Sequence, residues 1–169
     1  MSLYGVPDVF GPATDAQGAG GQSLQRILVP VGSNGQADRA LALAAEFSAG
    51  VGGQLRLIHV RIWDPPLKGT GRFYPETGRQ ATKVLEKALT SAWAYGVPAS
   101  GVVVDAARSR IAHAIAAEAY AWRAEVMVVT RRRRWAIGAL LLGSLSNKLM
   151  RKAGCPVLVV HQERQKVSH

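Results

Sequence analysis

The side chains best suited to chemistry lie in one stretch near the end of the sequence. Residues 131–134 are four consecutive arginines, and Gly143 and Ser144 open a helical pattern further on. Guanidinium groups bind phosphate through paired hydrogen bonds, and the free N–H groups at a helix N-terminus also favour anions. Each part has a structural alternative. Ser144 could act only as an N-cap, and the arginines could form a solvated loop that like charges keep open.

Two apolar runs of mostly β-branched residues flank this stretch, at 126–129 and 157–160. Such short runs are typical of strands buried on both faces, as in a parallel sheet. Parallel neighbours need a crossover connection, which the helical pattern after Ser144 supplies. Because ligands bind outside the carboxyl ends of the strands in an open sheet, we expect any site to lie in the loop at 130–142.

Several catalytic and nucleotide-binding patterns are absent from the sequence. No Lys follows a Gly, which excludes a Walker-type phosphate loop, and no Gly-x-Gly-x-x-Gly follows the first apolar run. The histidines show neither the spacing of metal ligands nor an evident carboxylate partner. They are His59, His113, His161 and His169. His59 is expected near a strand end in a structural role, because nothing nearby is positioned to orient it as a base. We therefore expect no catalytic residues, no metal site and no enzyme.

Length, charge and cysteine usage narrow the class of protein. The 169 residues are enough for one domain with a substantial core. The single cysteine, Cys155, excludes an internal disulfide and is compatible with the cytoplasm, where we expect the protein. No apolar stretch approaches the roughly 18 residues of a membrane span. The net charge of +10 favours a polyanionic partner, or is simply that of a basic soluble protein.

Strand and helix patterns alternate between two tails. We expect a disordered tail at 1–23, one domain at 24–162 and a polar tail at 163–169. Strands are predicted at 26–31, 55–62, 101–105, 126–129 and 156–161, and helices at about 36–49, 75–95, 111–122 and 144–152. The Pro- and Gly-rich segment 63–74 is expected to be a surface loop. This alternation predicts an α/β fold, a doubly wound open sheet of five parallel strands with helices on both faces.

Three sequence segments together resemble the universal stress protein A family. They are Ile-Leu-Val-Pro-Val at 27–31, Leu-Ile-His-Val at 57–60, and Leu-Leu-Leu-Gly-Ser-Leu-Ser followed by Cys-Pro-Val-Leu-Val-Val at 140–160. The resemblance covers about residues 24–162. It implies the strand order 3-2-1-4-5 and a homodimer paired through the last strand, from Val157 to Val160. Nucleotide-binding members hold ATP with an Asp after strand one and a Gly-x-x-Gly, nine residues, Gly-Ser/Thr motif after strand four.

On this sequence the nucleotide motif is eroded. Thr130 and Arg133 stand at the two earlier glycine positions, and Gly32 stands at the Asp position. Thr and Arg resist the backbone conformations that glycine allows next to phosphate, and Gly32 lacks the carboxylate. We therefore expect weak or absent ATP binding and no ATP cofactor.

Other positions still match that nucleotide motif. Gly143 and Ser144 match its final pair, and Val60 matches a position that lines the adenine pocket. With Arg131 and Arg133 they form the expected residual nucleotide or anion site.

Three functions remain open at this point. The first is a non-catalytic dimeric module in stress response or signalling, with an unknown protein partner. The second is binding of a polyanion or nucleic acid through the arginines at 131–134, and the third is ATP binding with slow hydrolysis. For the dimer, a proline at Leu158 is expected to remove a hydrogen-bond donor from the exposed strand edge.

Overall fold

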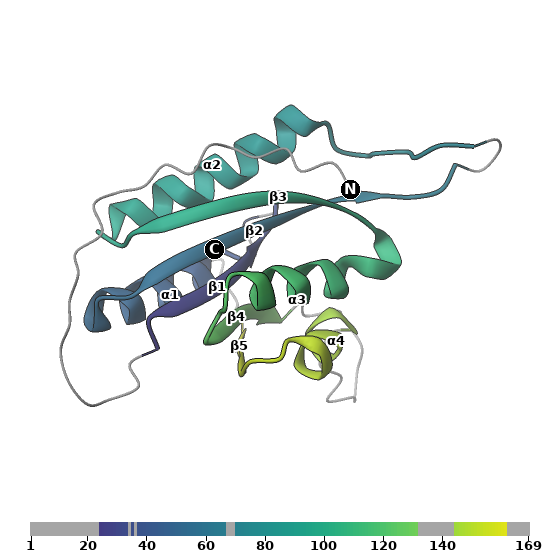
Figure 1. Ribbon diagram of the computed structural model, residues 1–169. Coiled ribbons are helices and arrows are strands. Elements are labelled where there is room, and N and C mark those ends of the chain that lie inside the picture. Colours follow the sequence, from purple (N-terminus) through teal and green to yellow (C-terminus); the bar gives the residue numbers. More distant parts are fainter. Residues whose placement is uncertain (1–23, 34, 36, 67–69, 132–143, 162–169) are drawn as a thin grey trace, which may run out of the picture.

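Parallel strands form one open sheet between two layers of helices (Figure 1). The computed structural model describes residues 24–33, 35, 37–66, 70–131 and 144–161. The elements in chain order are β1 (Arg26–Val31), α1 (Asp38–Val51), β2 (Gln54–Trp63), α2 (Gly78–Ala94), β3 (Ala99–Ala107), the 3-10 turn η1 (Arg108–Arg110), α3 (Ile111–Ala121), β4 (Val126–Arg131), α4 (Ser144–Lys152) and β5 (Val157–His161). The tails predicted at 1–23 and 163–169 lie outside the described residues.

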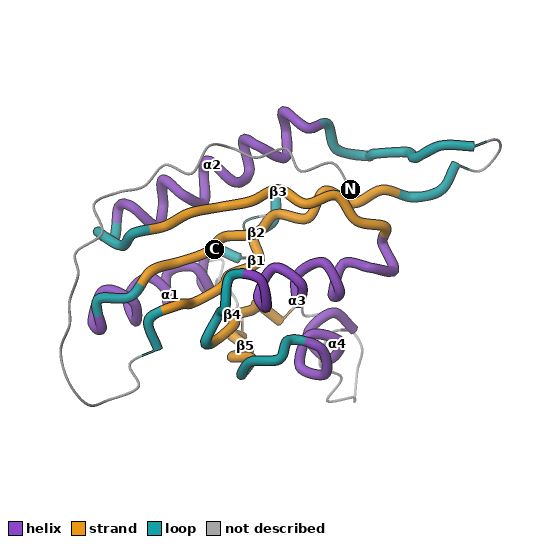
Figure 2. The backbone as a smooth tube through the Cα atoms, viewed as in Figure 1, coloured by secondary structure: helices purple, strands orange, loops and turns teal. Residues whose placement is uncertain are grey.

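The five-stranded sheet has the order β3-β2-β1-β4-β5, and every neighbouring pair is parallel. The predicted fold class and the order implied by the family resemblance are thus confirmed. Helices α1 and α2 cover one face, and α3 and α4 cover the other (Figure 2). Within the described part of the chain, no helix combines the length and apolar character that crossing a membrane requires.

The central strand β1 divides the interior into two cores. Ile27 and Val29 pack with α1 and α2, whereas Leu28 packs with α3 and α4. Leu28 and Val29 have no exposed surface. Successive side chains of a strand point to opposite faces, so a continuous apolar run is what a strand covered on both sides requires.

β2 and β3 are longer than the strands predicted at 55–62 and 101–105. The segment that follows β2 therefore begins further along the chain, at Asp64. Their paired register runs from Leu55 opposite Ala99 to Trp63 opposite Ala107. The segment 64–77 is called the arm below, and its described parts are residues 64–66 and 70–77. These parts leave β2 and return toward α2 at the upper right of Figure 1. An antiparallel bridge joins Asp64 to Phe73, so the predicted surface loop is partly paired.

Helix α2 begins three residues later than predicted, at Gly78 and not at Pro75. Thr77 is its N-cap: the Thr77 hydroxyl accepts from the Gln80 backbone N–H, and the Gln80 side chain accepts from the Thr77 N–H. This capping box satisfies the backbone N–H groups of Thr77 and Gln80, and it fixes the start of the helix directly after Thr77.

The expectation about a proline at Leu158 is wrong. The Met127 N–H donates to the carbonyl of Pro156 at 3.0 Å, and Met127 lies opposite Val157. In a parallel ladder the next inward-pointing donor on β5 is therefore the N–H of Leu158, which faces β4. The outward-pointing donors belong to Val157 and Val159. A proline at Leu158 would disrupt the sheet itself.

β3 and α2 approach closely at Gly101. A β-carbon there would lie 2.7 Å from Cδ1 and 3.0 Å from Cγ of Leu85, whose side chain is fully buried. A larger residue would have to displace Leu85 or move α2 away from the sheet, because packed interiors yield little.

Gly101→Ala should lower the free energy of unfolding by about 1–3 kcal/mol, as overpacking of a core does. Gly50→Ala is the matched control, because a β-carbon at Gly50 in α1 meets no atom within 4 Å. That change should stabilise by about 0.5–1 kcal/mol through helix propensity. Urea unfolding of both variants measures the difference, and equal effects would contradict the close approach.

Candidate functional site

The carboxyl ends of β1, β2 and β4 bring predicted site residues to one edge of the sheet. Val31 lies opposite His59 at the end of the β1–β2 register, so Gly32 follows beside Val60. The register of β1 with β4, continued to the ends of both strands, places Arg131 on the other side of Gly32. Gly32 therefore lies between Val60 and Arg131, at the centre of the predicted site.

Val60 and Thr130 point to opposite faces of the sheet. Val60 packs against the core beneath α3 and α4. Thr130 lies opposite Val160, which belongs to the core beneath α1 and α2, and paired residues share a face. The hydroxyl oxygen of Thr130 is buried and has no hydrogen-bond partner among the residues that the structure describes. The Thr130 side chain is thus directed away from the face that Val60 lines.

The phosphate end of the predicted site is described only in part. α4 begins at Ser144, as predicted, and β4 ends at Arg131. The side chains of these two residues lie outside the described part of the chain, as do Gly143 and Arg133. The described geometry here is a strand end and a helix start, and the role of the arginines at 131–134 stays a prediction.

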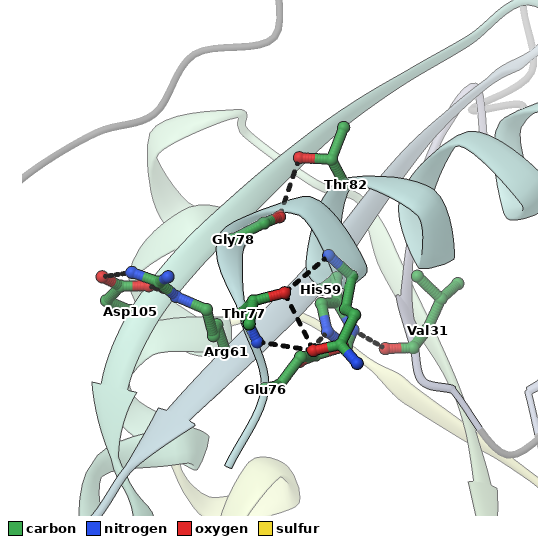
Figure 3. Close-up of polar contacts among 9 residues, drawn as sticks. Val31, His59, Arg61, Glu76, Thr77, Gly78, Thr82 and Asp105 are labelled. Atoms are coloured by element: carbon green, nitrogen blue, oxygen red, sulfur yellow. Dashed lines mark hydrogen bonds and ion pairs between the residues drawn. The ribbon is translucent and has the colours of Figure 1, made fainter. Parts of the chain in front are cut away.

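His59 lies within β2 and is only 5% exposed. Its Nδ1 lies 3.0 Å from the carbonyl oxygen of Val31, and its Nε2 lies 2.8 Å from Oε2 of Glu76 on the arm (Figure 3). The prediction that His59 has no carboxylate partner and lies near a strand end is therefore wrong. The structural role that we expected for it is consistent with these contacts.

The two contacts of His59 define where its hydrogens lie. A carbonyl oxygen can only accept, so Nδ1 must carry a hydrogen that it donates to Val31. The 2.8 Å contact from Nε2 to Glu76 then also needs a proton, held on the ring or on the carboxyl. Through these two contacts His59 joins Glu76 of the arm to the end of β1. Both ring nitrogens are engaged, so His59 is not available as a base.

Arg61 and Asp105 form a bidentate ion pair between β2 and β3. The guanidinium donates from Nε at 2.7 Å and from Nη2 at 2.6 Å to the two carboxylate oxygens (Figure 3). Tyr74 of the arm donates to Asp105 at 3.2 Å, and the Arg61 guanidinium lies 4.2 Å from the centre of its ring. The hydrogen bonds from Arg61 hold the pKa of Asp105 below its ordinary value, against the opposing effect of burial.

A second bidentate pair lies further out, where Arg108 of η1 donates to Asp64 at 2.9 and 2.6 Å. The hydrogen bond lowers the pKa of Asp64 and raises that of Arg108. Nearby, the Arg72 guanidinium lies 4.8 Å from the centre of the Trp63 ring. These contacts join the arm to β2 and to the turn after β3.

The described polar groups at this edge contact one another. Within the described ranges, no three His, Cys, Asp or Glu side chains are grouped in a way that could hold a metal ion. Partial burial raises the pKa of the Cys155 thiol, which disfavours the nucleophilic thiolate. The arrangement is suited to binding and to holding the arm in place.

A small hollow lies beside Gly32, between α1 and α2. Its volume is about 50 Å³, and its lining includes Val31, Asp38, Leu41 and Lys87. Pockets for small-molecule ligands have volumes of roughly 300–1,000 Å³, so this hollow is too small for a nucleotide.

The fold and the site together define a doubly wound α/β protein. The carboxyl ends of its strands, called the ligand edge below because ligands bind there in such sheets, are rich in arginine. The sequence profile of the universal stress protein family matches residues 23–161. The chain belongs to the universal stress protein family. The resemblance seen in the sequence is thereby confirmed over nearly the whole domain.

Individual relatives agree with this assignment. A Thermus aquaticus protein named universal stress protein in QAH/OAS sulfhydrylase 3′ region is 32% identical over 138 residues, covering 81% of this chain and 98% of that protein. A solved universal stress protein in complex with cAMP has a TM-score of 0.64 at 21% identity, covering 84% of this chain and 100% of that chain. One from Archaeoglobus fulgidus in complex with dAMP has a TM-score of 0.61 at 22% identity, covering 82% and 98%.

Sequence reasoning missed the contacts that hold the arm. Arg61 and Asp105 are 44 residues apart, and they meet because β2 and β3 pair in a register that places them opposite each other. Their opposite charges at the ends of two predicted strands were the available signal. Glu76 gave no comparable signal, because the path of the arm back to His59 depends on the bridge at Phe73.

Asp105→Asn should lower the free energy of unfolding at pH 7 by about 1–3 kcal/mol, because it removes the charge of the carboxylate that accepts two hydrogen bonds from Arg61. Since the folded pKa of Asp105 is depressed below 3.8, the wild-type advantage is present above the unfolded value and is lost as the pH falls through the folded one. The gap between the two proteins should therefore narrow as the pH falls below 3.8.

Urea unfolding at pH 7, 5 and 3 measures this gap. Glu86→Gln is the control, because Glu86 is an exposed carboxylate on α2 and its loss should change stability by less than about 0.5 kcal/mol. A wild-type advantage over Asp105→Asn that is the same at pH 3 and pH 7 would show that the charge of Asp105 contributes nothing.

Proposed function

We propose that this universal stress protein is a non-catalytic, dimeric module of cytoplasmic stress response or signalling that binds ATP weakly or not at all. The observation that carries the proposal is the position of Gly32. It lies between Val60 and Arg131 at the centre of the ligand edge, where the nucleotide-binding pattern of the family has an Asp. A glycine offers no carboxylate to a ribose or an adenine.

The other described parts of the ligand edge also support weak or absent ATP binding. Thr130, at the first glycine position of the motif, lies in the extended backbone of β4 and directs its side chain away from the Val60 face. The α4 N-terminus still presents free backbone N–H groups, which favour an anion. Related chains bind cAMP and dAMP, so the scaffold is compatible with a nucleotide. What remains here is an anion site without the adenosine contact.

The proposal of a non-catalytic role rests on the hydrogen bonds and ion pairs that the described polar side chains already make with one another. His59 is buried and bonded at both nitrogens, and Asp105 and Asp64 each bind an arginine. A general base or a nucleophile needs a free atom within reach of a substrate.

ATP titrated by calorimetry should bind wild type more weakly than micromolar. Each charge-assisted hydrogen bond lost costs about 1.5–3 kcal/mol, which corresponds to roughly 10- to 150-fold in affinity. Gly32→Asp together with Thr130→Gly and Arg133→Gly should recover binding. Ser33→Asp combined with the same Thr130→Gly and Arg133→Gly is the charge-matched control, one residue from the centre of the site, and should recover none. A micromolar or tighter wild-type dissociation constant would overturn the proposal and favour an ATP-binding protein with slow hydrolysis.

One observation favours a polyanion as an alternative ligand. The exposed cations Lys148, Arg151 and Lys152 lie on α4, directly after the loop that contains the four arginines. Lys148 and Lys152 are four residues apart and share a helix face. The arginine loop itself, residues 131–134, lies outside the described part of the chain except for the backbone of Arg131.

The homodimer proposed here is paired through β5. This strand bonds to β4 on one edge and lies last in the sheet order, so its outer edge is open among the described strands. Leu158 on this strand is 49% exposed. An open apolar edge presents unpaired N–H and C=O groups that a second strand satisfies.

Val159→Pro should convert the dimer to a monomer without unfolding it, because the N–H of Val159 points away from β4. Leu158→Pro is the matched control, and it should destabilise the fold because its N–H faces β4. Analytical ultracentrifugation at micromolar concentration reports the mass, and thermal unfolding reports stability. A monomeric wild type would refute the dimer.

A further inference from the structure

The arm, residues 64–77, is fixed to the sheet at successive residues. The backbones of Asp64 and Phe73 exchange two hydrogen bonds of 2.9 Å. Tyr74 donates its hydroxyl hydrogen to Asp105 of β3, and Glu76 contacts His59 of β2. This number of contacts gives the returning strand of the arm a defined position relative to the sheet.

Phe73 is a ring that the arm presents to solvent. The residues on either side of it, Arg72 and Tyr74, contact Trp63 and Arg61 of β2. Successive side chains of an extended segment point in opposite directions, so Phe73 points away from β2 and is 61% exposed. A ring on a fixed backbone loses little conformational entropy when a flat partner stacks on it.

Basic side chains outnumber acidic ones in the segments that form the arm and its attachment to the sheet. Over residues 61–79 and 105–110 the described basic side chains are Arg61, Arg72, Arg79, Arg108 and Arg110, and the acidic ones are Asp64, Glu76 and Asp105. Each of the three carboxylates already contacts a basic side chain. Arg108 is 62% exposed and is held by Asp64, whose backbone pairs with that of Phe73. Arg108 is therefore held by the residue whose backbone is bonded to that of Phe73.

The combination of a fixed ring and an excess of arginine selects among partners. A second copy that docked through this same surface is disfavoured, because the arginines of the two copies would face each other. A purely apolar partner would offer the guanidinium groups of the arginines no hydrogen-bond acceptor. Single-stranded nucleic acid offers both phosphates for the guanidinium groups and unpaired bases for the ring, whereas a duplex keeps the faces of its bases stacked.

We infer that the arm is a binding surface for single-stranded nucleic acid, with Phe73 stacking on a base and Arg72 and Arg108 contacting the backbone phosphates. Phe73, Arg72 and Arg108 are none of the residues predicted for the nucleotide site, and in the sequence they are distinct from the arginines at 131–134. The function of this surface does not depend on whether ATP binds.

Fluorescence anisotropy of the full-length protein with a labelled oligothymidylate of about 20 nucleotides tests this inference. Phe73→Ala should weaken binding about 5- to 100-fold, the usual effect of removing one stacking ring. Phe73→Leu, which keeps an apolar side chain but loses the ring, should behave in the same way, and Phe73→Trp should retain affinity. The matched control is Tyr120→Ala, because Tyr120 is an aromatic side chain on α3 that is 84% exposed.

Two further probes separate stacking from charge. Duplex DNA and inorganic polyphosphate have no unpaired bases, so their affinities should be the same for wild type and Phe73→Ala. Arg72→Gln should reduce the slope of log affinity against log salt for oligothymidylate by about 0.7, the value for one phosphate contact on a single strand. Lys83→Gln, at an exposed position of α2, removes the same charge and should leave that slope unchanged.

The four-arginine variant, with residues 131–134 changed to serine, separates the arm from the loop. If the arm binds, this variant keeps its preference for single strands over duplex and its dependence on Phe73. The inference is overturned if wild type does not bind oligothymidylate at low salt, or if Phe73→Ala and Phe73→Leu bind it as tightly as wild type does. It is equally overturned if the Phe73 variants lose duplex and single-strand binding to the same extent.

Discussion

β1 is paired on both edges and covered on both faces, and this enclosure dictates where the rest of the molecule can carry polar groups. Its interior residues Leu28 and Val29 have no contact with solvent. A strand enclosed in this way is accessible only at its ends, so the first position free to meet a ligand is Gly32. The neighbouring strands β2 and β4 bring Val60 and Arg131 to either side of it. The ligand edge is thus a consequence of how the centre of the sheet is buried.

Most of the fold could be predicted from the sequence, because its signals are local. Short β-branched runs alternating with helical patterns are sufficient for a parallel α/β sheet, and the strand order followed from the family resemblance. The start of α2 was misplaced because Pro75 suits a first helical turn as well as it suits the approach to a cap. Thr77 and Gln80 decide between the two through hydrogen bonds that only the folded backbone reveals.

The candidate site was predicted less completely, because it depends on register and on non-local pairing. Gly32, Val60 and Thr130 were located by alignment with a motif, but that motif does not state to which face each side chain points. The ladder assigns Val60 and Thr130 to opposite faces. The partner of His59 comes from the arm, and the direction of the Leu158 N–H follows from a single hydrogen bond, Met127 to Pro156. No pattern of residue types encodes either one.

The strand order also determines when each strand can pair while the chain is being synthesised on the ribosome. The three strands on one side of the sheet, β1 to β3, are complete once residue 107 has emerged, and they can pair with one another at that stage. The other edge of β1 then stays unpaired until β4 appears, after η1 and α3. A nascent chain of this protein therefore carries an open, largely apolar strand edge for the time taken to make those residues, which is the kind of edge that other chains and chaperones bind.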